Sequence, residues 1–286
     1  MDRNQLVGLT LIAVMHITYT QFFAPKPPAQ PVTTKEQLVP VVERAPAPHQ
    51  EEAPHLAALT PVVPAQYGIF APAMQGTEKE VVLENEDMRV TLTSRGGRIK
   101  QVVLKNYQDH QSQPFTFLDE QSSYMGFQLS THGMQLNTSD LFFKTADQAQ
   151  SVKETGLAKA TFTLPIGPGQ YIRQVFSFPG KGYTLTHAWE MVGLGAAIVQ
   201  GPIQFVWHDR IKRAEKDLEA CRNKTTVNYY LADDRFDHLE ERSEKKQEQL
   251  LQSPVQWLGI KQRFFTAGII AQKAFTSGYV ATTPTP

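Results

Sequence analysis

Several features that would mark a disulfide-rich, metal-binding or nucleic-acid-binding protein are missing from this sequence. Its 286 residues include one cysteine, Cys221, so the chain can form no internal disulfide and offers no cluster of thiolate ligands. Lys and Arg together number 28 and Asp and Glu together number 28, which gives a formal net charge of zero. Without a basic excess there is no field to recruit nucleic acid, and we expect no nucleic-acid partner.

Long apolar runs are also scarce, because Leu6–Phe23 alone is long enough to cross a bilayer. At about 1.5 Å per residue this run makes a helix of roughly 27 Å, close to the ~30 Å hydrocarbon thickness. Cleavage of a signal peptide after Ala24 would place the bulky Phe22 at the −3 position, where small residues are preferred, and Pro25 directly after the cut. Both features argue against removal of this segment. We expect an uncleaved anchor over residues 1–23, with a cleaved signal peptide or a buried soluble helix as alternatives.

The orientation of this anchor depends on Arg3, the basic residue that precedes the apolar run. A positive charge on the short N-terminal side favours an N-terminus inside the cell. The chain is therefore expected to be a single-pass membrane protein in contact with the lipid bilayer, with the remaining residues in the periplasm or an equivalent outer compartment.

His16 lies inside the predicted span, where an ionisable side chain is a functional candidate. With Ala13 and Thr20 it forms a small and polar stripe of the kind that docks on another helix. The alternative is a neutral imidazole that reaches a backbone carbonyl or the membrane interface.

Residues 24–77 form a segment rich in proline and alanine that cannot hold a helix or pair as a central strand. We expect an extended tether, partly in the polyproline II conformation, with an upper reach of about 150 Å. Two short apolar stretches, Leu56–Leu59 and Tyr67–Phe70, interrupt it and are candidates for docking on the domain. The prolines are Pro25, Pro27, Pro28, Pro31, Pro40, Pro46, Pro48, Pro54, Pro61, Pro64 and Pro72.

Residues 78–286 carry short runs of β-branched and apolar residues separated by turn residues, a pattern typical of strands. The Gly96-Gly97 pair between two runs predicts a tight turn with positive φ rather than a phosphate loop. Many short strands with few helices predict a mainly β fold, a sandwich of antiparallel sheets. Strands are expected at Val81–Leu83, Met88–Ser94, Arg98–Tyr107, Gln113–Leu118, Gly126–Ser130, Ala158–Leu164, Tyr171–Phe178, Tyr183–Met191 and Ile198–Trp207.

The pattern changes after Trp207, where two stretches are dense in charge. Asp209–Ala220 and Asp233–Leu251 are expected to be short amphipathic helices that lie on the sandwich and flank a strand at Thr226–Leu231. Opposite charges alternate in both, which favours a solvated face, with binding of a partner protein as the alternative. Cys221 is interpreted as a small residue near a helix end.

Five features occur in one order along the chain and together carry a resemblance. They are Met1–Gln5 before one apolar helix, a proline-rich tether, Val90–Ile99 followed by Val103–Tyr107, Tyr171–Phe176, and Trp257–Phe265. This series resembles the N-terminal part of the YidC family of bacterial membrane protein insertases, in the Oxa1/Alb3 superfamily. The resemblance covers the whole chain, although the tether matches in character only.

The resemblance implies a first transmembrane helix and a periplasmic β-supersandwich similar to galactose mutarotase, with helices packed at its C-terminal end. It implies a protein-transport and chaperone function, assisting insertion and folding of nascent inner-membrane proteins, alone or with the Sec translocon. A contact with its SecF component is implied, and no nucleotide, metal or other cofactor. The family's insertion groove belongs to helices that would follow Pro286, so this chain alone is not expected to insert proteins, and no insertase residue is assigned.

The stretch Trp257–Phe265 is expected to be a strand whose aromatic ends pin the late helices to the sandwich. Direct binding of a partner through this motif is the alternative.

A second class of function follows from the mutarotase-like fold, a membrane-tethered carbohydrate-binding or mutarotase-like protein. Such enzymes use a histidine and a carboxylate as general acid and base, for which His187 or His208 with Glu190 or Asp209 are the candidates. His187 and Glu190 lie three apart in a predicted strand and should face opposite sides. We therefore expect a protein that is not an enzyme, with no catalytic, cofactor-binding or metal-binding residue, since the eight histidines are scattered. A third class, a tethered adaptor of a secretion machine, would need long heptad hairpins, and none is visible.

Overall fold

A computed structural model describes residues 65–131, 134–195, 201–212, 216–240 and 245–283. The predicted anchor, His16, Ala13, Thr20 and most of the proline-rich segment lie outside these residues. Among the described residues, none of the helices has both the length and the apolar character needed to cross a membrane.

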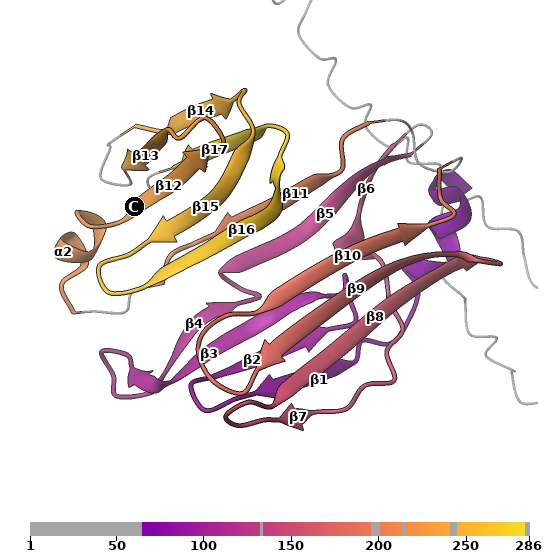
Figure 1. The fold of residues 1–286 in the computed structure, drawn as a ribbon, viewed down its shortest axis with the longest axis horizontal. Helices are drawn as coiled ribbons and strands as arrows, with labels where there is room; N and C mark the ends of the chain where they lie inside the picture. The colour runs from indigo at the N-terminus through magenta and orange to yellow at the C-terminus, as the bar shows by residue number, and fades with distance from the viewer. Residues whose placement is uncertain (1–64, 132–133, 196–200, 213–215, 241–244, 284–286) are drawn as a thin grey trace, which may run out of the picture. The chain divides into compact units, whose positions relative to one another are not determined.

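The main lobe contains three antiparallel sheets (Figure 1), apart from one parallel pairing between β1 and β7. In the order of their pairing, the first sheet is β4 (Pro114–Asp119), β3 (Arg98–Gln108), β2 (Met88–Thr93), β1 (Glu80–Glu84) and β7 (Gln150–Ser151). The second is β10 (Thr186–Val192), β9 (Gln170–Pro179) and β8 (Leu157–Gly167), and the third is β11 (Gln204–Asp209), β5 (Ser123–Thr131) and β6 (Met134–Asn137).

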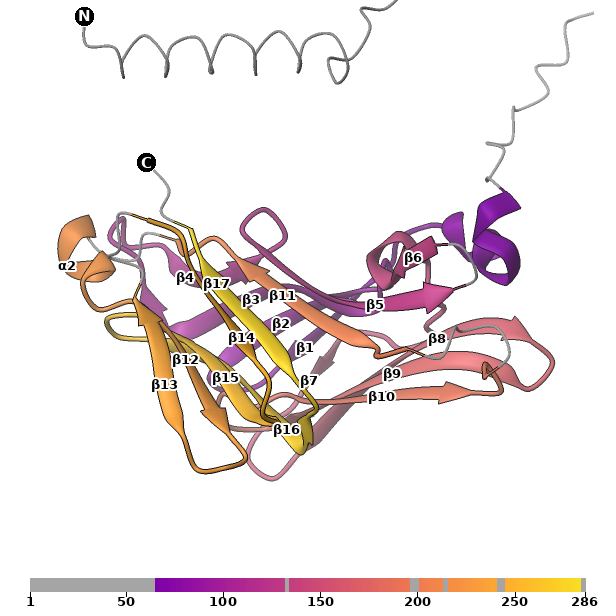
Figure 2. The same cartoon turned by 90° about the horizontal axis from the view of Figure 1, so that it is seen from above.

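The last strands, β12–β17, pair among themselves and form a second lobe, seen at the upper left of Figure 1 and in the left half of Figure 2. One of its sheets is β13 (Phe236–Glu240), β12 (Thr226–Leu231), β15 (Val255–Lys261) and β16 (Thr266–Phe275), and the other is β14 (Gln247–Leu251) and β17 (Gly278–Thr282). Short helices complete the fold: η1 (Ala65–Met74), η2 (Thr138–Asp140) and α2 (Leu218–Arg222).

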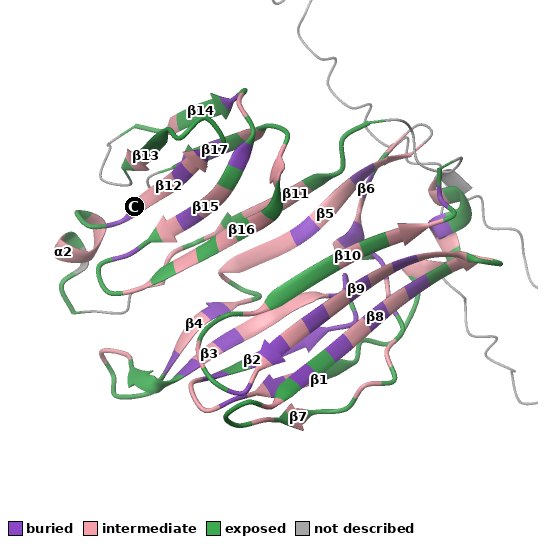
Figure 3. Cartoon of the chain, in the orientation of Figure 1, coloured by how far each residue is buried: buried purple, intermediate pink, exposed green. Residues whose placement is uncertain are grey.

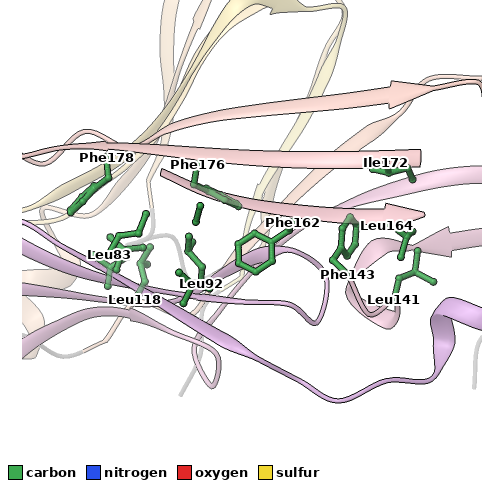
Figure 4. Packing of buried hydrophobic residues seen from close by; sticks show 14 of the residues in the cluster. Leu83, Leu92, Leu118, Leu141, Phe143, Phe162, Leu164, Ile172, Phe176 and Phe178 are labelled. Carbon is green, nitrogen blue, oxygen red and sulfur yellow. The ribbon is translucent and has the colours of Figure 1, made fainter. Parts of the chain in front are cut away.

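The core of the main lobe forms because buried and less buried positions alternate along β8 and β9 (Figure 3). The side chains at every second position point to the same face of the sheet and pack against the facing sheet. Their burial removes apolar surface from water, which stabilises the fold. Figure 4 shows Phe176 and Phe178 of β9 opposite Leu83 and Leu92 of the first sheet, with Phe162 beside them. Each such side chain contributes about 1.5–3 kcal/mol when fully buried.

The turn expected at Gly96-Gly97 has the predicted positive φ, and the turn at Gly169 shares this conformation. Gly96 and Gly97, between β2 and β3, have φ values of 86° and 59°, and Gly169, between β8 and β9, has 69°. Gly97 also has a steric reason to be glycine, because a Cβ there would lie 2.6 Å from Nε2 of Gln174.

The expected docking of Tyr67–Phe70 is confirmed at Phe70, which is 2% exposed and belongs to the main core. Gly76 also packs closely, because a Cβ there would lie 2.6 Å from Cβ of Phe142. The packed part of the chain therefore includes residues that precede Glu78.

The mainly β fold is confirmed, and the strand at Thr226–Leu231 has the predicted bounds. Eight of the nine strands listed by sequence pattern match β1–β5 and β8–β10, although β10 begins only at Thr186. The ninth, expected at Ile198–Trp207, corresponds to β11, which begins at Gln204, and residues 196–200 lie outside the described residues. The short strands β6 and β7 were not expected.

The two predicted helices are wrong for most of their length. In Asp209–Ala220, the residues up to Lys212 are not helical, and the helix found here, α2, begins only at Leu218. In Asp233–Leu251 the structure has β13 and β14. β13 lies at the edge of its sheet, and charged side chains are favoured on edge strands because they discourage pairing with other chains.

Candidate functional site at the junction of the two lobes

The two lobes meet at an aromatic cluster around Phe265, which follows β15 in a turn closed by a hydrogen bond from the Gln262 amide to the Phe265 carbonyl (2.7 Å). Its ring centroid lies 4.6 Å from that of Phe115, 5.9 Å from that of Phe117 and 5.2 Å from that of Tyr107. The last pair meets edge to face, at 84°. One side chain of the C-terminal lobe therefore packs against strands β3 and β4 of the main lobe.

Charged groups lie close to this cluster. Asp119, at the end of β4, forms an ion pair with Lys212 and accepts a hydrogen bond from the Ser122 hydroxyl (2.8 Å). Partial burial acts to raise the pKa of Asp119, but Lys212 and Ser122 outweigh it and hold the pKa below its usual value. This carboxylate is therefore ionised near neutral pH.

Asp209, at the end of β11, is the second carboxylate of this group. Burial, with the negative charge of Asp119 as a further cause, raises the pKa of Asp209 to about 6, and Lys212 opposes that shift. Two acidic groups thus share one ammonium group, and their pKa values move in opposite directions.

A small hollow opens beside Phe265, lined from both sides of the junction. Its volume of about 20 Å³ provides space for roughly one water molecule. A sugar ring or a peptide side chain does not fit in it. The lining residues are Ile211, Lys212, Cys221, Thr225, Gln262, Arg263, Phe264 and Phe265.

The structure separates His187 from Glu190, as their spacing predicts. Nε2 of His187 lies 3.1 Å from Oε1 of the buried Gln174, and the imidazole stacks on Phe176 with ring centroids 4.4 Å apart. Glu190 forms an ion pair with Arg173 at 3.3 Å, and neither side chain is buried. Although His187 is partly open to solvent, desolvation by the surrounding protein lowers its pKa to about 4, so it is neutral at pH 7.

The structure also separates His208 from Asp209. They are consecutive in β11 and so project to opposite sides of the strand. His208 is exposed, whereas Asp209 lies half-buried beside Asp119 and Lys212. None of the candidate residues for acid–base chemistry is therefore brought together with its expected partner.

Within the described ranges, no group of three or more His, Cys, Asp or Glu side chains is arranged to hold a metal ion. Cys221 is half-buried in the last turn of α2, as its interpretation near a helix end predicts.

The predicted strand at Trp257–Phe265 is confirmed as far as Lys261, where β15 ends. The aromatic residues at the two ends of the motif, Trp257 and Phe265, contact different lobes. Trp257 stacks on Tyr230 within the C-terminal lobe, whereas Phe265 contacts the main lobe. The motif therefore joins two β lobes. The expectation that it holds late helices against the sandwich is wrong, because the segment Asp233–Leu251 forms strands β13 and β14.

The ion pair between Asp119 and Lys212 and the buried Gln174 were not expected from the sequence. Nε2 of Gln174 donates a hydrogen bond of 2.7 Å to the Gly96 carbonyl, which ties β9 to the β2–β3 turn. The one available signal for Gln174 was a polar residue at an inward position of β9, between Ile172 and Phe176.

The fold and this junction define a class, a β-sandwich domain with a smaller C-terminal β lobe. The family model for the YidC periplasmic domain matches residues 80–285. Because this match covers more than half of the chain, the chain belongs to the YidC family of membrane protein insertases.

Several curated relatives, all named membrane protein insertase YidC, are similar to this chain. The protein of Amoebophilus asiaticus is 48% identical over 288 residues, covering 100% of this chain and 47% of the relative. The protein of Cytophaga hutchinsonii is 31% identical, covering 96% of this chain and 44% of the relative. The chain thus spans about half the length of the relatives it matches, and these names do not favour the carbohydrate-binding alternative.

Proposed function

We propose that this chain assists the insertion and folding of inner-membrane proteins from the periplasmic side, as the anchored N-terminal half of an insertase. The observation that carries the proposal is the match over residues 80–285 to a periplasmic domain found in proteins named as insertases. The separation of His187 from Glu190 and of His208 from Asp209 supports a role without acid–base catalysis.

In this proposal Leu6–Phe23 anchors the chain in the inner membrane and the proline-rich segment joins it to the domain. The apolar run supports it because its length suits a bilayer and its C-terminal flank lacks a good cleavage site. His16, with Ala13 and Thr20, is the proposed helix-docking stripe of this anchor.

The proposed partners are the lipid bilayer, nascent inner-membrane proteins and the Sec translocon, with a contact to its SecF component as the finer proposal. The insertion groove itself is assigned to the half of the relatives that this chain does not span. The contribution of this domain is therefore to bind and position partners outside the bilayer.

The experiment that tests the proposal is a chimera with the Amoebophilus relative, in which residues 1–286 of this chain replace the aligned half. The chimera is expected to support insertion of a single-span test protein in insertase-depleted cells. A matched chimera lacking residues 65–283 is expected to insert the test protein several-fold more slowly. Equal insertion rates with and without these residues would contradict an assisting role of the domain.

A further inference from the structure

The turn that joins β15 to β16 presents an exposed aromatic ring at one end of the C-terminal lobe. A hydrogen bond from the Gln262 amide to the Phe265 carbonyl (2.7 Å) closes this turn. Its two phenylalanines have different surroundings, because Phe265 packs into the junction whereas Phe264 is 62% exposed. Phe264 is a member of neither hydrophobic core of the described residues. Packing within the domain therefore does not account for an aromatic residue at this position.

Two basic residues of the same turn lie close to this ring. The guanidinium carbon of Arg263 lies 4.9 Å from the ring centroid of Phe264. Such a cation–π contact keeps the positive charge beside the ring without neutralising it. Lys261, at the end of β15, is also exposed. The turn therefore combines one apolar ring with two cationic groups.

A third basic residue, Lys224, comes from the neighbouring turn between α2 and β12. The Lys224 amide donates a hydrogen bond to the Cys221 carbonyl (3.1 Å) in this turn. The hollow at the junction is lined by Cys221 and Thr225 on one side and by Arg263 on the other, so the two turns are neighbours. Figure 1 shows α2 and the turn between β15 and β16 at the same end of the lobe. We call Lys224, Lys261, Arg263 and Phe264 the basic tip.

The positive charges of the basic tip are not neutralised within the domain. All three cationic side chains are exposed, and none of them takes part in an ion pair of the described residues. Glu240 of β13 is kept apart from Lys261 by β12, because Thr226 pairs with both. The three charges are therefore available to an anionic partner.

The shape of the basic tip favours a lipid surface over a protein partner. The hollow beside the tip has a volume of about 20 Å³, roughly one water molecule, so it cannot receive a side chain from a partner. A rigid protein would need a pocket of its own for the ring of Phe264, whereas lipid headgroups rearrange around a projecting ring. Aromatic side chains enter the boundary between headgroups and acyl chains, and neighbouring Lys and Arg residues bind anionic headgroups.

We propose that the basic tip binds the surface of an anionic phospholipid bilayer, with the ring of Phe264 at headgroup level and the three cationic side chains on lipid phosphates. Each basic residue near such a surface strengthens binding roughly fivefold, so the three charges together have a large effect. This inference rests on the proposed function for the presence of a bilayer, which the proposed anchor supplies. It adds a second contact with that bilayer, made by the domain itself.

The test uses the full chain reconstituted into lipid nanodiscs, with the photoreactive side chain p-benzoylphenylalanine in place of Phe264. After illumination, mass spectrometry is expected to detect a phospholipid adduct of the chain. The yield should be several-fold higher in nanodiscs that contain phosphatidylglycerol than in nanodiscs of phosphatidylcholine alone. The matched control carries the same side chain in place of Phe236, which is 56% exposed in the same lobe, and is expected to give little lipid adduct.

A second variant tests the charges of the basic tip. Lys224→Gln/Lys261→Gln/Arg263→Gln, combined with the photoreactive side chain at position 264, is expected to lower the adduct yield on anionic nanodiscs at least tenfold. Its control removes the same number of positive charges from the main lobe and should leave the yield unchanged. Equal melting temperatures of the two variants show that both are folded. The control changes three exposed lysines, Lys153→Gln, Lys159→Gln and Lys181→Gln.

The proposal is overturned if the probes at Phe264 and Phe236 give equal lipid adducts, or if neutral and anionic nanodiscs give the same yield at position 264. A crosslink from position 264 to a second copy of the chain, or to another protein in cells, in place of lipid would assign the tip to a protein partner and would also contradict the proposal. Such a failure leaves the proposed function standing, because the chimera lacking residues 65–283 measures assistance in insertion whatever the tip binds.

Discussion

Phe265 and Phe115 hold the two lobes together, with ring centroids 4.6 Å apart and ring planes inclined by 31°. One residue follows β15 and the other lies in β4, so this contact joins parts of the chain that are far apart in sequence. Phe117 and Tyr107 complete the set of rings around Phe265. Phe265 therefore links the C-terminal lobe to strands β3 and β4 of the main lobe.

Phe265→Ala is expected to loosen the C-terminal lobe. Truncating a fully buried phenylalanine costs about 3–5 kcal/mol, and the partly buried Phe265 should cost on the order of 2 kcal/mol. Hydrogen exchange by mass spectrometry should show faster exchange in β12–β17 and little change in β8 and β9. The matched control is Phe264→Ala, because Phe264 is 62% exposed, and equal effects of the two changes would contradict the role of Phe265.

Asp209→Asn is expected to change how stability depends on pH. The pKa of Asp209 rises from 3.8 when unfolded to about 6 when folded, so the unfolded chain loses this proton first as pH increases. The wild type therefore loses stability between about pH 4 and 6, and the variant lacks this loss. His187 has the opposite dependence, losing stability as pH falls from 6.5 toward 4, but it is common to both proteins.

The measurement is the melting temperature Tm of both proteins from pH 4 to pH 7.5. The difference in Tm, variant minus wild type, should increase from pH 4 to about pH 6 and stay constant above pH 6. A difference that stays constant would show that the Asp209 carboxyl does not titrate as its burial beside Asp119 requires.

Gln174→Leu is expected to destabilise the main lobe. The change keeps the approximate volume but leaves the Gly96 carbonyl without the hydrogen bond from Nε2, which typically costs about 1–3 kcal/mol. Urea unfolding measures this loss as a lower midpoint with an unchanged slope. Gln135→Leu is the control because Gln135 is exposed and its side chain bonds to Ser130 at the surface, and it should shift the midpoint much less.

The strands of the main lobe could be predicted because their residues alternate between a buried and a less buried face. In β9, Ile172, Phe176 and Phe178 all face the core at the period of two that the sequence displays. The Gly96-Gly97 turn was predictable for a similarly local reason, since positive φ favours glycine.

The late strands could not be predicted in this way because they are short, exposed and charged. In β13 the apolar Phe236 and Leu239 are spaced by three, which suggests a helical face, but they point to opposite faces of a strand. The ion pair between Asp119 and Lys212 could not be predicted from a local pattern either, because these residues are 93 apart in sequence and meet only once β11 has paired with β5.

The most direct test of a membrane-anchored periplasmic domain is labelling with a membrane-impermeant maleimide in the background Cys221→Ser. Leu157→Cys reports on the domain, because Leu157 is 65% exposed, and Asp2→Cys reports on the N-terminus. In cells with a permeabilised outer membrane, Leu157→Cys should be labelled at once and Asp2→Cys only after the inner membrane is lysed. Protection of Leu157→Cys until lysis would contradict a periplasmic domain, and recovery of the protein in the soluble fraction would contradict the anchor.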